Sequence, residues 1–298
     1  MKAYEAVIVG GSYAGLSAAM ALGRAMRSVL IIDSGMPCNR QTPHSHNFIT
    51  HDGEKPAIIA SKAQEQVLRY PTVQLLKDKV TNVSGSINQF IVETAGKEQF
   101  TARRVLFATG MKDLFPDIPG IAECWGISVI HCPYCHGYEV RGEKTGIMAN
   151  GEIGTLFSRL VNQWTKDLTL FTNGPAILTD ENRQVLQRKN IAVIEKQITS
   201  IEHDNGYIQH LVFNDGSRQA LTALYAKLPM EQHCTIPQEL GCELLESGFI
   251  KVDDFQKTTV PGIYAAGDNT IVFRSVSAAV AAGTKAGAMM NHSMMEEE

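Results

Sequence analysis

Two cysteines separated by two residues are the strongest chemical feature of the sequence. They lie in the segment 131–136, which reads His-Cys-Pro-Tyr-Cys-His. One turn of helix would bring the sulfurs of Cys132 and Cys135 within disulfide distance, and Pro133 suits the first position of such a helix. A helix N-terminus also lowers the pKa of a thiol toward that of a reactive thiolate. The spacing therefore predicts a pair that can cycle between dithiol and disulfide.

Two other kinds of chemistry compete for this pair. Zinc would need two further ligands, and although Cys124 and His131 lie nearby, the sequence has no second CxxC and no histidine pair that follows the CxxC at finger spacing. The pair followed by His136 also matches the pattern that attaches c-type haem. A redox dithiol is the third alternative, and His136, whose type has an ordinary pKa of about 6.5, could then move a proton near neutral pH.

The elements around these residues follow an α/β pattern. Glu5–Val9 and Ser28–Asp33 are apolar runs rich in β-branched residues, and Ala14–Met26 between them has helical spacing, so they predict a βαβ unit with parallel strands. A second unit of this kind begins near Thr145, with a turn at 150–154 and a helix at 155–166.

The order of these units predicts two Rossmann-like domains, the second inserted into a discontinuous first. We place the first domain at residues 1–115 and 231–298 and the middle domain at 116–230. The antiparallel or mixed part of the first sheet is expected around 90–109, residues 258–268 as an extended strand, and a helix at 275–291 followed by a frayed acidic tail, 296–298.

A glycine-rich turn joins the first strand to its helix. Residues 10–15 read Gly-Gly-Ser-Tyr-Ala-Gly, which keeps the first and third glycines of the dinucleotide-binding pattern and replaces the second by Ser12. Such a turn presents backbone N–H groups to a pyrophosphate. An acidic residue is expected about 20 positions on to hold ribose hydroxyls, and Asp33 lies 23 residues beyond Gly10. The candidate nucleotide contacts here are Gly10, Ser12, Tyr13, Ala14, Gly15 and Asp33.

Composition excludes several other classes of protein. The net charge of −4 leaves no basic surplus for nucleic acid, and six unevenly spaced cysteines do not form a disulfide scaffold. The uncharged run 6–22 is interrupted by glycines and preceded by Glu5, so it predicts neither a secretory signal nor a membrane span. We expect a cytoplasmic protein, and haem attachment, which requires export, is disfavoured for the same reason.

Two further segments carry a family resemblance. Residues 105–110 end in Ala-Thr-Gly, at Thr109 and Gly110, and residues 258–268 close in Gly267 and Asp268 before a helix. With the first glycine turn, they resemble the FAD-binding signatures of the pyridine-nucleotide–disulfide oxidoreductase flavoproteins. The resemblance implies a bound FAD, with Asp268 hydrogen-bonded to its ribityl chain.

Within that family, the sequence is similar to the thioredoxin-reductase branch, where a CxxC in the inserted domain faces the flavin. The resemblance implies that Cys135 is the flavin-proximal sulfur and that Cys132 exchanges with an outside disulfide. It also implies that the loop holding His44, His46 and His51 lines a substrate cavity rather than a metal site. The remaining flavin contacts that it implies are Arg40, Gln41, Asn47, Arg274 and Ser275.

Two departures from the branch bear on its chemistry. His136 stands where the branch commonly has an aspartate as its acid–base group. The segments 132–139 and 240–243 look like those of the dithiol oxidases acting on gliotoxin and holomycin, which pass electrons to oxygen.

The second departure concerns the nucleotide. In the middle domain, Ala149 replaces the first glycine of the turn, and 172–174 reads Thr-Asn-Gly where an NADPH binder usually has His-Arg-Arg. Without a bidentate arginine, a 2′-phosphate loses its strongest contact, so we expect NADPH to be an inefficient donor.

These features lead to one hypothesis with two rivals. We expect an FAD-dependent thiol–disulfide oxidoreductase that uses Cys132, Cys135 and His136 and binds no metal. Its partner would be a small-molecule dithiol or disulfide, or a thioredoxin-like protein, and a homodimer is expected because the family usually forms one. The rivals are a disulfide reductase supplied by NADPH or ferredoxin, and a non-catalytic flavin redox sensor.

Overall fold

The computed structural model describes residues 1–297 and divides them into two compact units. The first contains residues 1–40, 57–112 and 230–297, and the second contains residues 41–56 and 113–229. The boundaries expected at 115/116 and 230/231 lie within three residues of the structural ones. The segment 41–56, which the sequence placed in the first domain, makes its contacts within the second unit instead.

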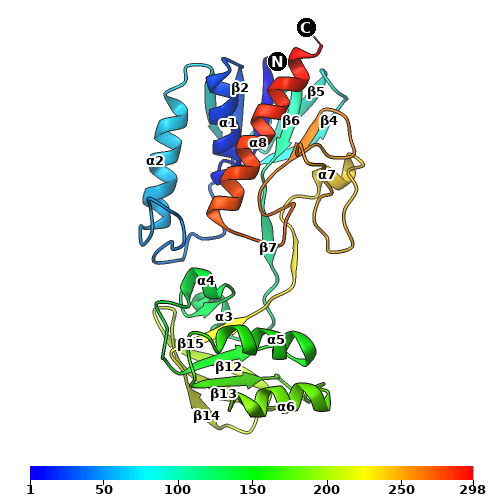
Figure 1. Ribbon diagram of the computed structural model, residues 1–298. Helices are drawn as coiled ribbons and strands as arrows, with labels where there is room; N and C mark the ends of the chain where they lie inside the picture. Colours follow the sequence, from blue (N-terminus) through cyan, green and yellow to red (C-terminus); the bar gives the residue numbers. More distant parts are fainter. Residues whose placement is uncertain (298) are drawn as a thin grey trace. The chain divides into compact units, whose positions relative to one another are not determined.

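The first unit is built on a seven-stranded sheet with the order β3-β2-β1-β6-β5-β4, where β17 also pairs with β6 (Figure 1). β1, β2, β3 and β17 run parallel to their neighbours, whereas β4, β5 and the first half of β6 pair antiparallel, as expected around residue 90. Its elements are β1 (Lys2–Val9), α1 (Tyr13–Arg24), β2 (Val29–Asp33), α2 (Pro56–Leu68), β3 (Val73–Lys77), β4 (Val80–Ser84), β5 (Phe90–Thr94), β6 (Gln99–Phe107), β7 (Met111–Asp113), β16 (Met230–Gln232), α7 (Ile236–Glu239), β17 (Ile263–Ala265) and α8 (Val276–Met295).

The second unit contains a five-stranded parallel sheet, β11-β10-β9-β15-β8, and an antiparallel sheet, β12-β13-β14. Both faces of the parallel sheet are covered. Its strands therefore consist of consecutive apolar residues. The elements are α3 (Ile121–Cys124), β8 (Val129–Ile130), α4 (Pro133–His136), β9 (Thr145–Met148), α5 (Gly151–Val161), β10 (Leu168–Phe171), α6 (Asp180–Arg188), β11 (Ala192–Ile194), β12 (Ile198–Asp204), β13 (Tyr207–Phe213), β14 (Arg218–Ala220) and β15 (Ala223–Ala226). The prediction of an α/β fold with two Rossmann-like domains is confirmed by this architecture and by the solved relatives described below.

Two expected elements differ in extent. The helix expected at 155–166 is α5, which begins at Gly151 because the Asn150 side chain accepts a hydrogen bond from the Gly151 N–H and caps the helix. The strand expected over 258–268 is limited to Ile263–Ala265, because Pro261 and Gly262, whose φ is +82°, turn the chain before it.

Helices α1 and α8 lie side by side in the first unit (Figure 1). Gly283 and Gly287 on α8 make this possible, since a Cβ on Gly283 would lie 2.0 Å from the carbonyl oxygen of Ala14 and one on Gly287 would lie 2.5 Å from that of Ala18. The start of α8 is thereby fixed against the glycine turn that begins α1.

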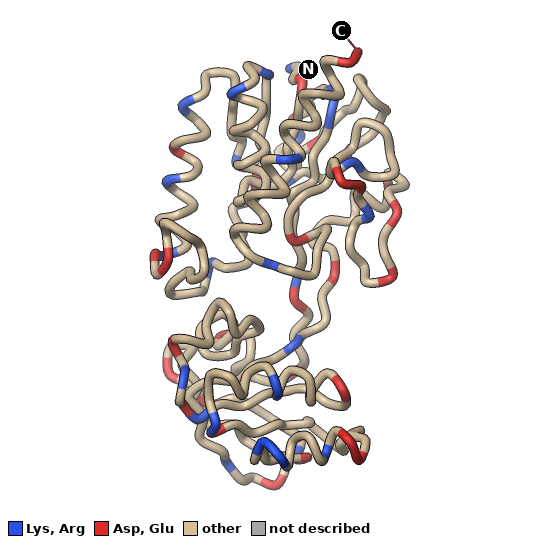
Figure 2. Tube along the Cα trace, in the orientation of Figure 1, with Lys and Arg blue, Asp and Glu red and all other residues tan. Residues whose placement is uncertain are grey.

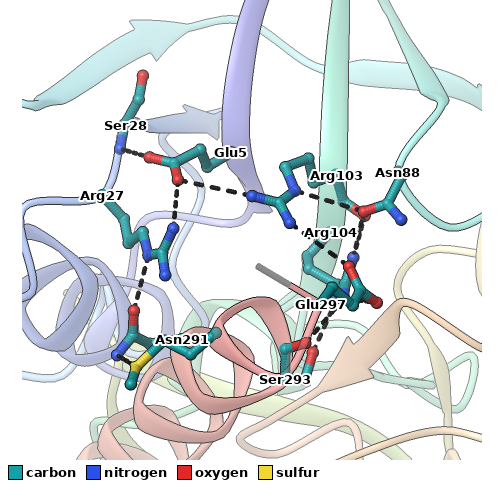
Figure 3. A network of polar contacts seen from close by, with 10 residues as sticks. Glu5, Arg27, Ser28, Asn88, Arg103, Arg104, Asn291, Ser293 and Glu297 are labelled. Carbon is teal, nitrogen blue, oxygen red and sulfur yellow. Dashed lines mark hydrogen bonds and ion pairs between the residues drawn. The ribbon is translucent and has the colours of Figure 1, made fainter.

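The C-terminal end of α8 is held by a buried arginine rather than frayed (Figure 3). Arg104 on β6 is 1% exposed and donates hydrogen bonds to Asn88 Oδ1, Ser293 Oγ and the carboxylate of Glu297. The expectation of a frayed tail is therefore wrong at Glu297, while residue 298 lies outside the described residues.

Charge is spread over both units, with basic and acidic side chains interspersed (Figure 2). None of the helices within residues 1–297 has the length and apolar character needed to cross a bilayer.

Candidate active site

The CxxC segment forms the short helix that its spacing predicts. Cys132 is the N-cap of α4 and Pro133 is its first residue, while the N–H groups of Cys135 and His136 each donate to the Cys132 carbonyl oxygen at 3.2 Å. This turn places Cys135 Sγ 2.7 Å from Cys132 Sγ. Both side chains are partly buried, and the sulfurs are close enough to form a disulfide without movement of the backbone.

The two thiols differ strongly in acidity. The pKa of Cys132 is lowered to about 7, chiefly because the Cys135 thiol donates a hydrogen bond to its thiolate and also because backbone N–H groups of Tyr134 and Cys135 point at it. The pKa of Cys135 is raised for the reciprocal reason, with burial and the negative charge of Glu139 adding to the effect. Cys132 is therefore the thiolate of the pair and Cys135 keeps its proton.

This difference predicts a site-specific pH dependence. In the reduced protein, alkylation of Cys132 by iodoacetamide should rise with pH through an inflection near 7, because the thiolate is the reacting form and its fraction grows as pH increases past the pKa. Peptide mass spectrometry resolves Cys132 from the exposed Cys38, which serves as the internal comparison. An inflection at about 8.5 or higher, the range of an unperturbed cysteine, contradicts the assignment.

The first unit gathers the residues expected to bind a dinucleotide. Gly10 has φ +105° and a Cβ on it would lie 2.3 Å from the Ala108 carbonyl oxygen, next to Thr109; a Cβ on Gly15 would lie 1.9 Å from the Gly10 carbonyl oxygen. Only glycine permits this close approach of the turn to the end of β6. Asp33, at the end of β2, accepts a hydrogen bond from the Gly11 N–H at 3.0 Å, as an acidic residue facing the turn should.

The Gly-Asp segment lies beside the same turn. Gly267 has φ +98°, and a Cβ on it would lie 3.0 Å from Ala14 Cβ. Arg274 Nε lies 3.3 Å from Asp268 Oδ2, so the arginine is an ion-pair partner of the residue that the resemblance assigns to the ribityl chain. Ser275 caps α8 by accepting a hydrogen bond from the Ala278 N–H.

Comparison with known proteins decides the family. A family model described as pyridine nucleotide-disulphide oxidoreductase matches residues 4–283. The chain belongs to this family. It is 31% identical over 307 residues to thioredoxin reductase tcpT of Claviceps purpurea, covering 98% of this chain and 95% of the relative.

Solved structures agree with this assignment. The oxidoreductase from Agrobacterium tumefaciens superposes with a TM-score of 0.93 at 36% identity and covers all of both chains. HlmI also has a TM-score of 0.93, at 30% identity, and covers 99% of this chain and 93% of HlmI. The predicted resemblance to the thioredoxin-reductase branch is confirmed, and the protein is an oxidoreductase.

His136, the residue predicted to carry out acid–base chemistry, has an unusual environment. Burial lowers the pKa of His136 to about 4, and the nearby imidazoles of His131 and His46 lower it further. At neutral pH the imidazole is therefore uncharged and is a weak base, so the expectation that His136 moves a proton near neutral pH is wrong.

The loop 41–56 contributes one of its three histidines to a cavity beside the CxxC helix. His46 Nε2 lies 3.5 Å from Glu139 Oε1, and its Nδ1 lies 3.6 Å from Asp52 Oδ1. A cavity of about 280 Å³ is lined by His46, Asn47, Asp52, Pro133, Tyr134, Tyr138, Glu139 and Trp164.

His44 and His51 do not line this cavity. His44 Nδ1 lies 2.9 Å from the Gly53 carbonyl oxygen, and the ring of His51 stacks on Phe48. Of the three histidines, His46 lines the cavity, and a substrate in this cavity stays a prediction. Within residues 1–297, no group of three or more histidine, cysteine, aspartate or glutamate side chains is arranged to hold a metal.

Three residues carried over as flavin contacts have partners close to them in sequence or within the second unit. Gln41 Nε2 donates to the carbonyl oxygens of Ala122 and Trp125, and the Asn47 N–H donates to Asp52. Arg40 Nη1 donates to the Pro37 carbonyl oxygen at 3.2 Å.

The second glycine turn of the oxidoreductase is filled by its own side chains. Asn150 Oδ1 accepts from the N–H groups of Gly151 and Ile177, and its Nδ2 donates to the carbonyl oxygens of Thr172 and Pro175. Ile177 covers Gly151, where a Cβ would already lie 3.3 Å from Ile177 Cγ1. The Gly151 N–H at the start of α5 therefore already has an acceptor.

Sequence reasoning missed the roles of Asn150, Asp52 and Glu139. An asparagine directly before the helix is a usual N-cap signal, and it predicts the capping hydrogen bond of Asn150. Nothing in the sequence predicts that Asp52 and Glu139, which are 87 residues apart by number, flank the same imidazole.

Proposed function

We propose that the protein is an FAD-dependent thiol–disulfide oxidoreductase that cycles Cys132 and Cys135 against the flavin and oxidises a small dithiol, with little use of NADPH. The observation that carries the proposal is the 2.7 Å separation of two sulfurs whose pKa values are moved in opposite directions. A structural pair would not need one stabilised thiolate.

The first glycine turn fits FAD. Gly10 and Gly15 lie so close to backbone carbonyl oxygens that neither could carry a Cβ, so the backbone at these two positions of the turn has no side chain over it. The Thr109 hydroxyl and the Asn269 side-chain oxygen are buried beside this turn without a hydrogen-bond partner among the described residues, which is typical of groups that await a polar ligand. Gly10–Gly15, Asp33, Thr109 and Asp268 would hold the cofactor, which supplies, when bound, the acceptor or donor for two electrons.

The acidity of the two thiols fits the exchange step. A thiolate of the substrate attacks Cys132 Sγ of the protein disulfide, and the Cys132–Cys135 bond breaks; Cys135, whose pKa is raised, takes up a proton. The second thiol of the substrate then attacks the substrate's first sulfur, which is bonded to Cys132 in the mixed disulfide. The bond to Cys132 breaks, and Cys132, with a pKa of about 7, leaves as a thiolate. The proton of that second thiol goes to solvent, because a His136 imidazole with a pKa of about 4 is too weak a base to hold it near neutral pH. Two electrons and two protons leave the substrate, and its disulfide forms.

The cavity beside α4 supports a small-molecule substrate. Its walls are the aromatic rings of Tyr134, Tyr138 and Trp164 with the carboxylates of Asp52 and Glu139, and it adjoins Pro133 between the two cysteines. A volume of about 280 Å³ suits a small molecule rather than a protein segment.

The alternative hypothesis of a disulfide reductase depends on NADPH, and the second glycine turn does not favour NADPH binding. The cavity of about 410 Å³ at the ends of β9, β10 and β15 is lined mainly by apolar residues, with Lys227 as its one basic lining residue, and Asn150 and Ile177 occupy the turn itself. A pyrophosphate at the start of α5 would have to compete with Asn150 Oδ1 for the Gly151 N–H.

Anaerobic mixing tests the proposal and its direction of electron flow. The FAD-loaded protein is mixed in parallel with dithiothreitol, NADPH and NADH while flavin absorbance is followed. Dithiothreitol should bleach the flavin about 100-fold faster than NADPH, as expected when about two charge-assisted contacts to the 2′-phosphate are missing. NADH, which has no 2′-phosphate, should also be slower than dithiothreitol. Admitting air should restore the colour.

Each result has a separate meaning. Bleaching by NADPH as fast as by dithiothreitol contradicts the proposed electron source. A purified protein that neither carries nor takes up FAD contradicts the flavin assignment, and a single change of state without turnover favours the redox sensor.

A further inference from the structure

Tyr225, a buried tyrosine of the second unit, carries a hydroxyl that its packing does not explain. Tyr225 lies on β15, where it is 1% exposed, and its ring packs edge-on against Phe157 with the centroids 5.6 Å apart. In the parallel register of β15 and β8 it pairs with Ile130. The chain leaves β8 at that point and reaches Cys132 two residues later.

The hydroxyl of Tyr225 is sealed inside the protein without a hydrogen-bond partner among the described residues. Burying a phenol in this way costs stability, and a phenylalanine would fill the same space without that cost. A buried polar group with no partner requires a functional explanation or a partner in another state of the site.

The groups that interact with this hydroxyl belong to the CxxC segment. Besides its own burial, the charges of Cys132, Glu139 and Cys135 raise the pKa of Tyr225 above its ordinary value. The phenol is therefore protonated when Cys132 ionises, so that it is a donor and not a competing anion. A neutral O–H near a thiolate stabilises the charged form of the sulfur if the two meet.

We propose that the Tyr225 hydroxyl is a hydrogen-bond donor to the Cys132 thiolate of the reduced protein. The contact forms when Cys132 turns about its single side-chain torsion, since Cys132 is the partly exposed N-cap of a four-residue helix whereas Tyr225 is fixed in the core. Cys135 donates to Cys132 only while it keeps its own proton; Tyr225 continues to do so after that proton has gone. The inference rests on the proposed dithiol cycle and adds a third member to it.

Site-resolved alkylation of the Tyr225→Phe variant tests the inference. In the fully reduced protein, the inflection of Cys132 alkylation by iodoacetamide should move up by about one pH unit, as expected for loss of one hydrogen bond to a charged group. At pH 7 the alkylation rate of Cys132 should then fall about fivefold, from a thiolate fraction near one half. Tyr207→Phe removes the hydroxyl of an exposed tyrosine in the same unit and should leave the inflection unchanged.

Two further measurements separate the donor role from a packing role. Thermal melting of Tyr225→Phe should match the parent or exceed it, because the substitution removes a buried hydroxyl without a partner. The same substitution in a Cys135→Ser background should again raise the Cys132 inflection, since Tyr225 acts without the neighbouring thiol.

Unchanged inflections in both backgrounds overturn the inference. Alkylation of the reduced protein requires no flavin turnover, so this test and the bleaching test of the proposed function can fail independently.

Discussion

Replacing Cys132 by serine is expected to lower the turnover of dithiol oxidation by a factor on the order of 10³ or more, since removing a nucleophile that acts in every cycle leaves only binding. Cys132 is the ionised member of a pair whose sulfurs are 2.7 Å apart, and serine has no accessible anion near neutral pH. Oxygen uptake with dithiothreitol as substrate measures the loss. The FAD content of the variant should stay the same, because Cys132 lies in the second unit and the glycine turn that fits FAD lies in the first.

Two other variants complete this experiment. Cys38→Ser makes the same change at an exposed cysteine outside the pair and should retain full turnover. Cys135→Ser should also lose turnover, because no protein disulfide forms without Cys135 and Cys132 alone cannot accept two electrons from the dithiol substrate. Turnover of Cys132→Ser within tenfold of the parent contradicts the proposed cycle.

Arg104→Ala is expected to lower the free energy of unfolding by about 2–4 kcal/mol, because truncation of a large buried side chain leaves a cavity and strands its polar partners. Arg104 is 1% exposed and joins β6 to the last turn of α8 through Ser293 and Glu297, with Asn88 as a third partner (Figure 3). Urea unfolding at neutral pH measures the change as a lower midpoint with an unaltered slope.

Arg103→Ala is the matched control. Arg103 is the neighbouring residue and also lies near Glu297, but it is 28% exposed, so its ion pairs are worth about 1 kcal/mol or less. The Arg104 contacts lower the pKa of Glu297 below its ordinary value of 4.5, so this ion pair stabilises fully above that pH and its contribution is lost as pH falls through the lowered value. The difference between parent and Arg104→Ala should therefore narrow in acid. Equal unfolding midpoints for the two arginine variants contradict the role given to Arg104.

The sequence predicts best where backbone geometry and residue type are locally linked. The runs of β-branched residues locate β1 and β2 within three residues, and the glycines at 10 and 15 locate a turn that no other residue could form. The spacing of Cys132 and Cys135 likewise predicts the helical turn that brings their sulfurs together. In each case, the elements concerned are neighbours along the chain.

Contacts between distant segments account for what the sequence does not predict. His46 meets Glu139 only because loop 41–56 folds with the second unit, and Tyr225 approaches the CxxC only through the register of β15 with β8. The acidity of His136 was expected to be ordinary, but burial and two nearby imidazoles lower its pKa to about 4. The residues next to His136 in the sequence do not predict this burial or these neighbouring imidazoles.

The discontinuous first unit has a consequence for biosynthesis. The chain passes between units after residues 40, 56, 112 and 229, so most of the second unit leaves the ribosome as one stretch, whereas β17 and α8 are among the last residues made. Until they emerge, the second half of β6 has β1 on one edge but lacks β17 on the other, and α1 lacks the helix whose glycines fit against it. The nascent chain thus exposes an apolar helix face and an open strand edge during most of translation, which are the surfaces that chaperones recognise and that cause aggregation when left uncovered.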